Sequence, residues 1–327
     1  MRPWCWTHVA DEARRYDAAM RMPAIGLLVA ACGGGARGPG GESAEPPPRP
    51  PYASPAPIAK PRLFAPGAVS TADPEFSISF AAAGATAYFD RANADRSKLT
   101  IVASTYANGA WQAAVALPFS TGEFRDVDPF VAGDRLYFSS NRPRPGSSDT
   151  DFDTWYVERA GAAWSAAVHV DGAPSGPGNQ LFVSIARDGT LYFQGDTAAG
   201  SRIYRAPRAA DGGYPTAALV DEAATAAETN PAISPDGTLL VFASDREGGA
   251  GAADLYLRRF RSGTWTPPVN LGAAINSPFA DFAPAFSPDG NYLFFTSERP
   301  GVAPAPTSGR PPGDIYQIDV AALPAAP

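Results

Sequence analysis

Acidic residues recur along this 327-residue sequence at intervals of about 50 residues, each just before an apolar stretch. Aligning the segments around them gives four acids and one amide at one equivalent position: Glu75, Asp126, Gln180, Glu228 and Asp281. If the repeated segments are arranged in a ring, these side chains surround one mouth of its central channel. There they could bind a cation or a basic segment of a partner protein, because focused like charge raises the local counter-ion concentration.

Arginines in recurring Ser-x-Arg stretches offer a second interpretation of the same acids. Three of the four acids are accompanied by such an arginine: Arg142, Arg246 and Arg299. The third repeat, which has Gln180 in place of the acid, also lacks the arginine. Buried carboxylate–arginine pairs fix geometry rather than bind ligands. Glu75 has Asn93 at the matching position, so we expect Glu75 to be the acid without an arginine partner.

Two other groups could do chemistry. Asp149, Asp151 and Asp153 alternate along one segment and could supply oxygen ligands for Ca²⁺, although the spacing of an EF-hand loop is missing, and a solvated acidic loop is the alternative. His169 has no serine and aspartate placed to complete a triad. A glycosidase would need two carboxylates across a pocket, which only the acidic ring could supply. We therefore predict a non-enzymatic protein without a cofactor.

The elements that position these residues are strands. One aromatic residue recurs in each of five repeats, at separations of 49, 55, 49 and 53 residues: Phe89, Phe138, Phe193, Phe242 and Phe295. The surrounding segments show β-type patterning and no helical period. A repeat of this length with several strands per unit predicts a β-propeller, in which each repeat is one blade.

Within the repeats, short motifs mark strand ends. Ser-Pro-Asp-Gly at 234–237 and 287–290 suits a type I turn between the first and second strands. Asp254-Leu-Tyr and Asp314-Ile-Tyr open the third strands. An aromatic residue leads each fourth strand: Trp111, Trp164, Tyr214 and Trp265. Because these aromatics recur once per repeat, we expect them to pack between blades.

These patterns predict an all-β, five-bladed propeller over residues 62–327. The repeats cover about 73–120, 121–174, 175–223, 224–275 and 276–321. The fifth repeat ends after its third strand, and an extra strand at about 63–69 precedes the first repeat. We expect this strand to complete the last blade, because closing the ring removes an exposed sheet edge.

The Ser-Pro-Asp-Gly, Ser-x-Arg and Asp-[Ile/Leu]-Tyr motifs together resemble the WD40-like, TolB-type propeller repeat of bacterial envelope proteins. The resemblance covers most of the chain after residue 60 and is strongest in the fourth and fifth repeats. It implies a protein-interaction platform in the periplasm. The same repeats also occur in peptidase propeller domains, so the resemblance leaves the function open.

The first 61 residues predict export and anchoring. An apolar run at 22–31 follows three arginines and ends at Cys32. Residues 29–32, Val-Ala-Ala-Cys, resemble a lipobox, which implies a lipidated Cys32 and an outer-membrane lipoprotein facing the periplasm or cell surface. Acidic residues before Met20 are unusual in a signal and favour a start at Met20 rather than Met1. The Gly- and Pro-rich segment 33–61 predicts a disordered linker.

Charge and cysteine content limit the classes of binding partner and of fold stabilisation that this protein could have. The net charge of −7 excludes the basic footprint of a nucleic-acid binder. Both cysteines precede the repeats, so the propeller cannot contain a disulfide. We expect a scaffold that binds another envelope protein, with carbohydrate or cell-wall binding or hydrolysis, or sensing of a small ligand or ion, as alternatives. The Gly- and Pro-rich loops at 143–153, 246–253 and 299–313 should share one face and form a variable binding surface.

Overall fold

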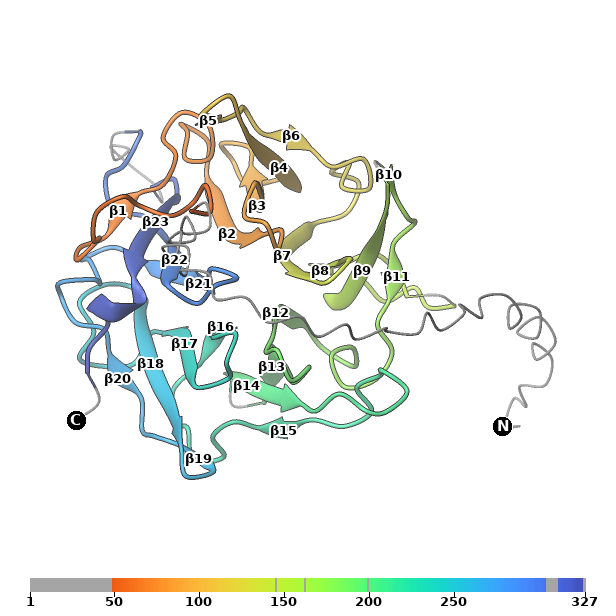
Figure 1. The fold of residues 1–327 in the computed structure, drawn as a ribbon. Coiled ribbons are helices and arrows are strands. Elements are labelled where there is room, and N and C mark those ends of the chain that lie inside the picture. Colours follow the sequence, from red (N-terminus) through yellow and green to blue (C-terminus); the bar gives the residue numbers. More distant parts are fainter. Residues whose placement is uncertain (1–48, 145, 162, 199, 304–310, 326–327) are drawn as a thin grey trace, which may run out of the picture. The chain divides into compact units, whose positions relative to one another are not determined.

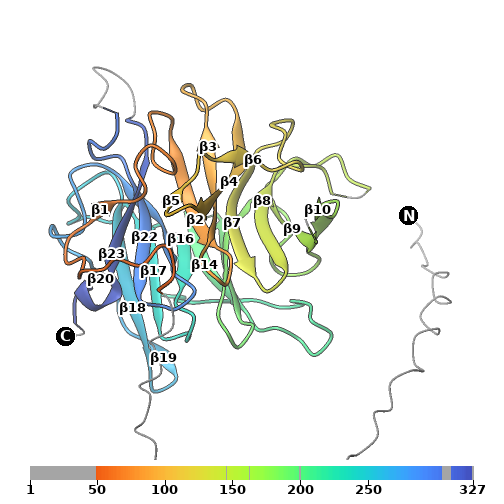
Figure 2. The same ribbon diagram turned by 45° about the horizontal axis from the view of Figure 1, so that its top comes forward.

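The computed structural model describes residues 49–144, 146–161, 163–198, 200–303 and 311–325. Within these ranges the chain forms 23 strands and one short 3₁₀ helix, Val320–Ala322 (Figures 1 and 2). The predicted lipidation site Cys32 and linker residues 33–48 lie outside the described residues.

The strands form five small antiparallel sheets, which we call blades 1 to 5. Blade 1 contains β2 (Glu75–Phe80), β3 (Thr86–Ala92), β4 (Leu99–Ala107), β5 (Ala110–Trp111) and β6 (Val115–Ala116). Blade 2 contains β7 (Asp126–Ala132), β8 (Arg135–Ser140), β9 (Asp153–Ala160), β10 (Ala163–Trp164) and β11 (Val168–His169). Blade 3 contains β12 (Gln180–Ile185), β13 (Leu191–Thr197), β14 (Gly200–Ala206) and β15 (Ala218–Leu219).

Blade 4 contains β16 (Thr229–Ile233), β17 (Leu239–Ser244), β18 (Asp254–Arg261), β19 (Thr264–Trp265) and β20 (Val269–Asn270). Blade 5 contains β21 (Asp281–Phe286), β22 (Tyr292–Ser297), β23 (Asp314–Asp319) and the N-terminal strand β1 (Arg62–Leu63). The first strand of each of these sets, β2, β7, β12, β16 and β21, contacts the first strands of both neighbouring blades around a common centre (Figure 1). The predicted five-bladed propeller is therefore confirmed.

The N-terminal strand closes the ring. Arg62 and Leu63 of β1 pair with Gln317 and Tyr316 of β23, and the amide of Phe64 donates to the carbonyl oxygen of Ile315 at 2.8 Å. The closing strand is shorter than the predicted 63–69, because Ala65 and Gly67 have φ values of 42° and 85°, which end the extended backbone. Closure itself is as predicted, with blade 5 built from both ends of the propeller.

Residues 49–61 are ordered against the propeller, which corrects the prediction that the linker extends to residue 61. Tyr52 is buried between Phe80, Tyr292 and Phe294, with ring centroids 4.9–6.3 Å apart. The amide of Ile58 donates to the Asp319 carboxylate at 2.9 Å. The side chains of Tyr52 and Ile58, 3% and 5% exposed, therefore anchor residues 49–61 as a Pro-rich strap, although the composition of this segment is typical of disorder.

The hydrophobic core consists of layers between blades. Alternation along each second strand sends adjacent residues to opposite faces, so Phe138 packs with blade 1 and Tyr137 packs with blade 3. The recurring phenylalanines are all buried. The aromatics that lead the outer segments pack on the preceding blade, as Trp164 does on Tyr88 and Trp265 on Tyr192. The predicted packing role of these aromatics is confirmed.

A repeated backbone irregularity links the innermost strands. In each blade the residue two positions after the predicted ring residue lies in a β-bulge and has a left-handed φ of 41–60°: Ser77, Asp128, Phe182, Asn230 and Ala283. Each bulge shifts the register with the second strand and turns the residue's amide out of its own ladder. In blades 2 and 3 that amide donates to a side chain of the preceding blade, from Asp128 to the Asp90 carboxylate at 2.9 Å and from Phe182 to Ser139 Oγ at 3.2 Å.

Ring closure gives a testable stability prediction. Phe64 is 5% exposed and lies 5.1–5.8 Å from the rings of Phe80, Trp111 and Phe294, between blades 5 and 1. We expect Phe64→Ala to lower the free energy of unfolding by about 3–5 kcal/mol, because the cavity would open at the seam of the ring. Chemical denaturation checks this. Val115→Ala, at a position that is 69% exposed, is the control and should change stability by less than about 0.5 kcal/mol.

Candidate functional site

The predicted acidic ring lies at one end of the innermost strands, which we call the acid end. All five side chains are buried, with exposures between 0% and 7%: Glu75, Asp126, Gln180, Glu228 and Asp281. Four of them are the first residues of their innermost strands and pair with the end of the second strand of the same blade, and Glu228 directly precedes β16. Their partners decide what they can do.

The three acids with a Ser-x-Arg stretch are held by the expected arginines. Arg142 Nη2 lies 2.6 Å from Asp126 Oδ1, and the corresponding pairs Arg246–Glu228 and Arg299–Asp281 are both 2.7 Å long. In each case the arginine Nε also donates to the Oγ of the serine two residues before it, at 2.7–3.0 Å. These carboxylates are therefore neutralised inside their own blades.

Glu75 is also paired, and the expectation that it lacks an arginine is wrong. Arg91 Nε lies 3.0 Å from Glu75 Oε1, because β3 pairs these two residues directly across the ladder. Thr71 Oγ1 also donates to this carboxylate. Burial nevertheless raises the pKa of Glu75 to about 7. The fifth ring residue, Gln180, accepts a hydrogen bond at its Oε1 from the backbone amide of Gly176, at 2.8 Å.

The three aspartates considered for calcium have separate partners. Asp149 is exposed near Arg144, Asp151 accepts the amide of Gly178 at 3.2 Å, and buried Asp153 lies 3.0 Å from Arg144 Nε. His169 contacts Asp153, which raises the pKa of the imidazole. Across the described ranges, no group of three His, Cys, Asp or Glu side chains is arranged to hold a metal ion.

One buried acid pair without arginines was missed by the sequence analysis. Asp90 and Asp128 lie between blades 1 and 2, where Asp128 Oδ1 accepts the Ser77 hydroxyl at 2.9 Å and the Asp128 amide donates to Asp90. Burial raises the pKa of Asp128 to about 7, and burial together with the neighbouring Asp128 raises the pKa of Asp90. The adjoining channel cavity is about 30 Å³, which holds a water molecule or two but no organic substrate.

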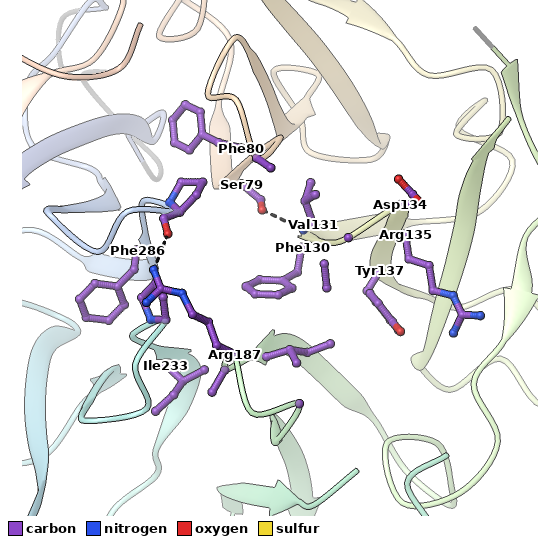
Figure 3. Close-up of a pocket in the computed structure, with 18 of the residues that line it drawn as sticks. Ser79, Phe80, Phe130, Val131, Asp134, Arg135, Tyr137, Arg187, Ile233 and Phe286 are labelled. Carbon is purple, nitrogen blue, oxygen red and sulfur yellow. Dashed lines mark hydrogen bonds between the residues drawn. The ribbon is translucent and has the colours of Figure 1, made fainter. Parts of the chain in front are cut away.

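The opposite end of the channel, where turns join first to second strands, opens into a cavity of about 630 Å³, which we call the turn-end pocket (Figure 3). Its rim consists of one equivalent turn residue per blade: Ala82, Gly133, Arg187, Pro235 and Pro288. Its floor consists of the apolar ends of the innermost strands: Phe80, Val131, Ile185, Ile233 and Phe286. Phe130 also points into the centre of this pocket in Figure 3.

Charge in the turn-end pocket is unevenly arranged. On one side Arg135 lies 2.9 Å from Glu158 and stacks 4.2 Å from the ring of Tyr156, so both charges are matched. Arg187, by contrast, crosses from blade 3 and donates from Nη2 to the carbonyl oxygen of Pro288 in blade 5 at 3.2 Å (Figure 3). The one hydrogen-bond acceptor of its side chain is neutral, and the side chain stands above an apolar floor. Arg208 of the same blade also lines the pocket and donates from Nε to the carbonyl oxygen of Gly212 at 3.3 Å.

This arrangement suits binding. The carboxylates that line the turn-end pocket are Asp134 and Glu158, and Glu158 is held by Arg135. An apolar floor with a few polar groups at its edge is typical of a ligand-binding cavity of this size. The sequence signal that could have found it is the turn of the third repeat, where Arg187 replaces the proline of Ser-Pro-Asp-Gly.

The known proteins that resemble this chain are distant from it in sequence. No family model matches the sequence, and a search of curated proteins finds no match. Similar solved structures include that of a protein described as "putative TolB" from Agrobacterium tumefaciens, with 15% identity, a TM-score of 0.48, and coverage of 77% of this chain and 79% of that chain. The catalytic domain of a Coprinopsis cinerea GH62 α-L-arabinofuranosidase has 12% identity and a TM-score of 0.49, and the match covers 80% of this chain and 98% of that chain. A Xanthomonas campestris gluconolactonase has 13% identity and a TM-score of 0.44, and the match covers 81% of this chain and 91% of that chain. At these identities and scores the likenesses carry no argument about function.

The ion pairs at the acid end give a second prediction. Arg142→Met should lower the free energy of unfolding by about 3 kcal/mol, because it leaves the Asp126 carboxylate buried without a cation. Adding Asp126→Asn to this variant should restore much of the loss, since the remaining amide is neutral. Arg125→Met, at an exposed neighbouring position, is the control. An unchanged stability in Arg142→Met would contradict the structural role of the pair.

The buried acid pair gives a third prediction. Because the folded-state pKa of Asp128 lies above the ordinary value of 3.8, native protein keeps a proton that the unfolded chain releases between about pH 4 and pH 7. This contribution to stability is present at low pH and lost as pH rises through 7. Asp128→Asn, which copies Asn230 of blade 4, should therefore match the wild type near pH 4 and exceed its stability at pH 8, by on the order of 2 kcal/mol.

Thermal unfolding of both proteins at several pH values measures this difference. Asp134→Asn, at an exposed turn position, is the matched control and should follow the wild type. A difference between Asp128→Asn and the wild type that does not change with pH would contradict a buried proton at this pair.

Proposed function

We propose that this protein is a non-enzymatic scaffold that binds another protein at the turn-end pocket. The observation that carries the proposal is the convergence of apolar side chains at the open end of the channel. Phe130, Val131, Ile185 and Phe286 come from three blades and remain half-exposed around a cavity of about 630 Å³. Apolar side chains gathered in one exposed hollow on an otherwise well-packed scaffold are typical of an interaction site.

The rigidity of the surroundings supports this proposal. The rim residues sit on short turns between strands that are locked into the ring, so the pocket is preformed and binding costs little ordering entropy. At the acid end, by contrast, the candidate ring acids Glu75, Asp126, Glu228 and Asp281 are held by arginines. Their role in this proposal is structural.

The proposed setting is the bacterial envelope. The lipobox-like residues before Cys32 and the basic and apolar segment that precedes them support export and anchoring of the chain as an outer-membrane lipoprotein. The described part of the chain contains no helix with the length and hydropathy needed to cross a bilayer. In this proposal the partner is another protein of the envelope, and the lipid on Cys32 provides the contact with the membrane.

A hydrolytic or carbohydrate-binding role is the competing proposal. Hydrolysis of a glycoside requires two carboxylates facing each other across a pocket, one of which holds a proton. In the turn-end pocket, Glu158 is paired with Arg135 and Asp134 lies on the exposed rim. This arrangement favours binding over hydrolysis, and chromogenic glycoside substrates would expose any activity directly.

Blocking the pocket tests the proposed function. Ala82 lines the rim and Ala83, its neighbour in the same exposed turn, does not. We expect Ala82→Trp to fill part of the cavity and to reduce crosslinked capture of an envelope protein by at least about tenfold, whereas Ala83→Trp captures as the wild type does. Both variants should fold, because both positions are exposed. Equal capture by all three proteins would move the binding surface to the loops at the acid end.

A further inference from the structure

Among the five equivalent rim residues of the turn-end pocket, one is charged. At the equivalent rim position, blades 1, 2, 4 and 5 carry Ala82, Gly133, Pro235 and Pro288, which are small or apolar. Blade 3 carries Arg187 at the same place. Because the turn geometry of the other blades does without a cation, the fold does not require this arginine.

The contacts of Arg187 are too few to give it a structural role. Its side chain is exposed and donates one hydrogen bond, to the carbonyl oxygen of Pro288. The arginines with a structural role at the acid end, such as Arg142 and Arg246, stack on aromatic rings and lie against carboxylates. A guanidinium presents several donors in a planar fork, so most of the donors of Arg187 are free to face a ligand.

Resting on the proposed function, we propose that the turn-end pocket recognises a protein segment that places an apolar side chain on the floor and a neighbouring carboxylate against Arg187. The apolar floor accounts for the first element, and Arg187, the one cation among the five rim residues, accounts for the second. Arg208, which also lines the pocket from blade 3, adds positive charge on the same side. Charge-assisted hydrogen bonds between guanidinium and carboxylate are among the strongest available at a partly exposed site. The matched pair Arg135–Glu158 contributes no net charge to this selection.

The depth of the pocket favours a peptide over a free fatty acid. Below the floor, the channel narrows to a cavity of about 30 Å³ between Ser77, Asp128 and Phe182. A long alkyl chain therefore finds no tunnel, whereas one side chain fits the shallow floor. The exposed turns around the rim leave room for the peptide backbone to enter and leave.

Defined peptides test this selection. The probes are acetyl-Gly-Ser-Phe-Glu-Ser-Gly-amide, the same peptide with Gln in place of Glu, the same peptide with Ala in place of Phe, and dodecanoate. Binding is measured by NMR titration at millimolar probe on wild type, Arg187→Gln and Arg187→Lys. We expect the Phe-Glu peptide to bind wild type about tenfold more tightly than the Phe-Gln peptide. The preference should persist in Arg187→Lys and vanish in Arg187→Gln.

The outcomes separate this inference from the proposed function. Equal binding of the Phe-Glu and Phe-Gln peptides, or a preference that survives in Arg187→Gln, overturns carboxylate recognition by Arg187 and leaves the pocket as an apolar binding site. Binding of dodecanoate without binding of the peptides overturns the peptide as occupant. Absence of binding by every probe overturns the inference as well, while capture by the Ala83→Trp protein and its loss in Ala82→Trp would still support the proposed function.

Discussion

The structure depends on burying both faces of every blade. A single blade cannot bury its own apolar faces, and these hydrophobic clusters each join residues from two consecutive blades. In an open row of blades, the first and the last blade would each leave one apolar face exposed, so the last blade has to pack against the first. The pairing of β1 with β23 provides this closure, because it makes the N-terminal and C-terminal parts of the propeller into one sheet. The strap that contains Tyr52 then covers the seam.

The same constraint explains why the acid end and the turn end differ. At the acid end, carboxylates sit where the innermost strands begin, and arginines from the loops after the second strands lie over them. Buried charge of this kind must be paired, which leaves it unavailable to a ligand. At the turn end the connections are too short to fold back over the channel. The apolar ends of the strands therefore stay open to solvent, and two arginines of blade 3 that line the pocket, Arg187 and Arg208, donate to carbonyl oxygens rather than to carboxylates.

Much of this could be predicted because the information is local and repeated. The phenylalanine of each second strand, the turn motifs and the Ser-x-Arg arginines recur at a period that only a propeller explains, and their blade-by-blade roles follow from alternation along a strand. The pairing of Arg142 with Asp126 could be predicted for the same reason. The partner of Glu75 could not, because Arg91 replaces the repeat's usual arginine from a different position, on the adjacent strand.

The sequence by itself determined the number of blades, the closing of the ring by an N-terminal segment and the residues that pack between blades, because these follow from a pattern that recurs along the chain and from the strand that the fifth repeat lacks. Only the tertiary structure decided which end of the channel is open. The buried pair Asp90–Asp128 joins two blades, and the turn-end pocket joins all five, with members separated by about 50 residues along the chain. A site of this kind has no local signature, since each member looks like an ordinary strand or turn residue until the ring brings the members together.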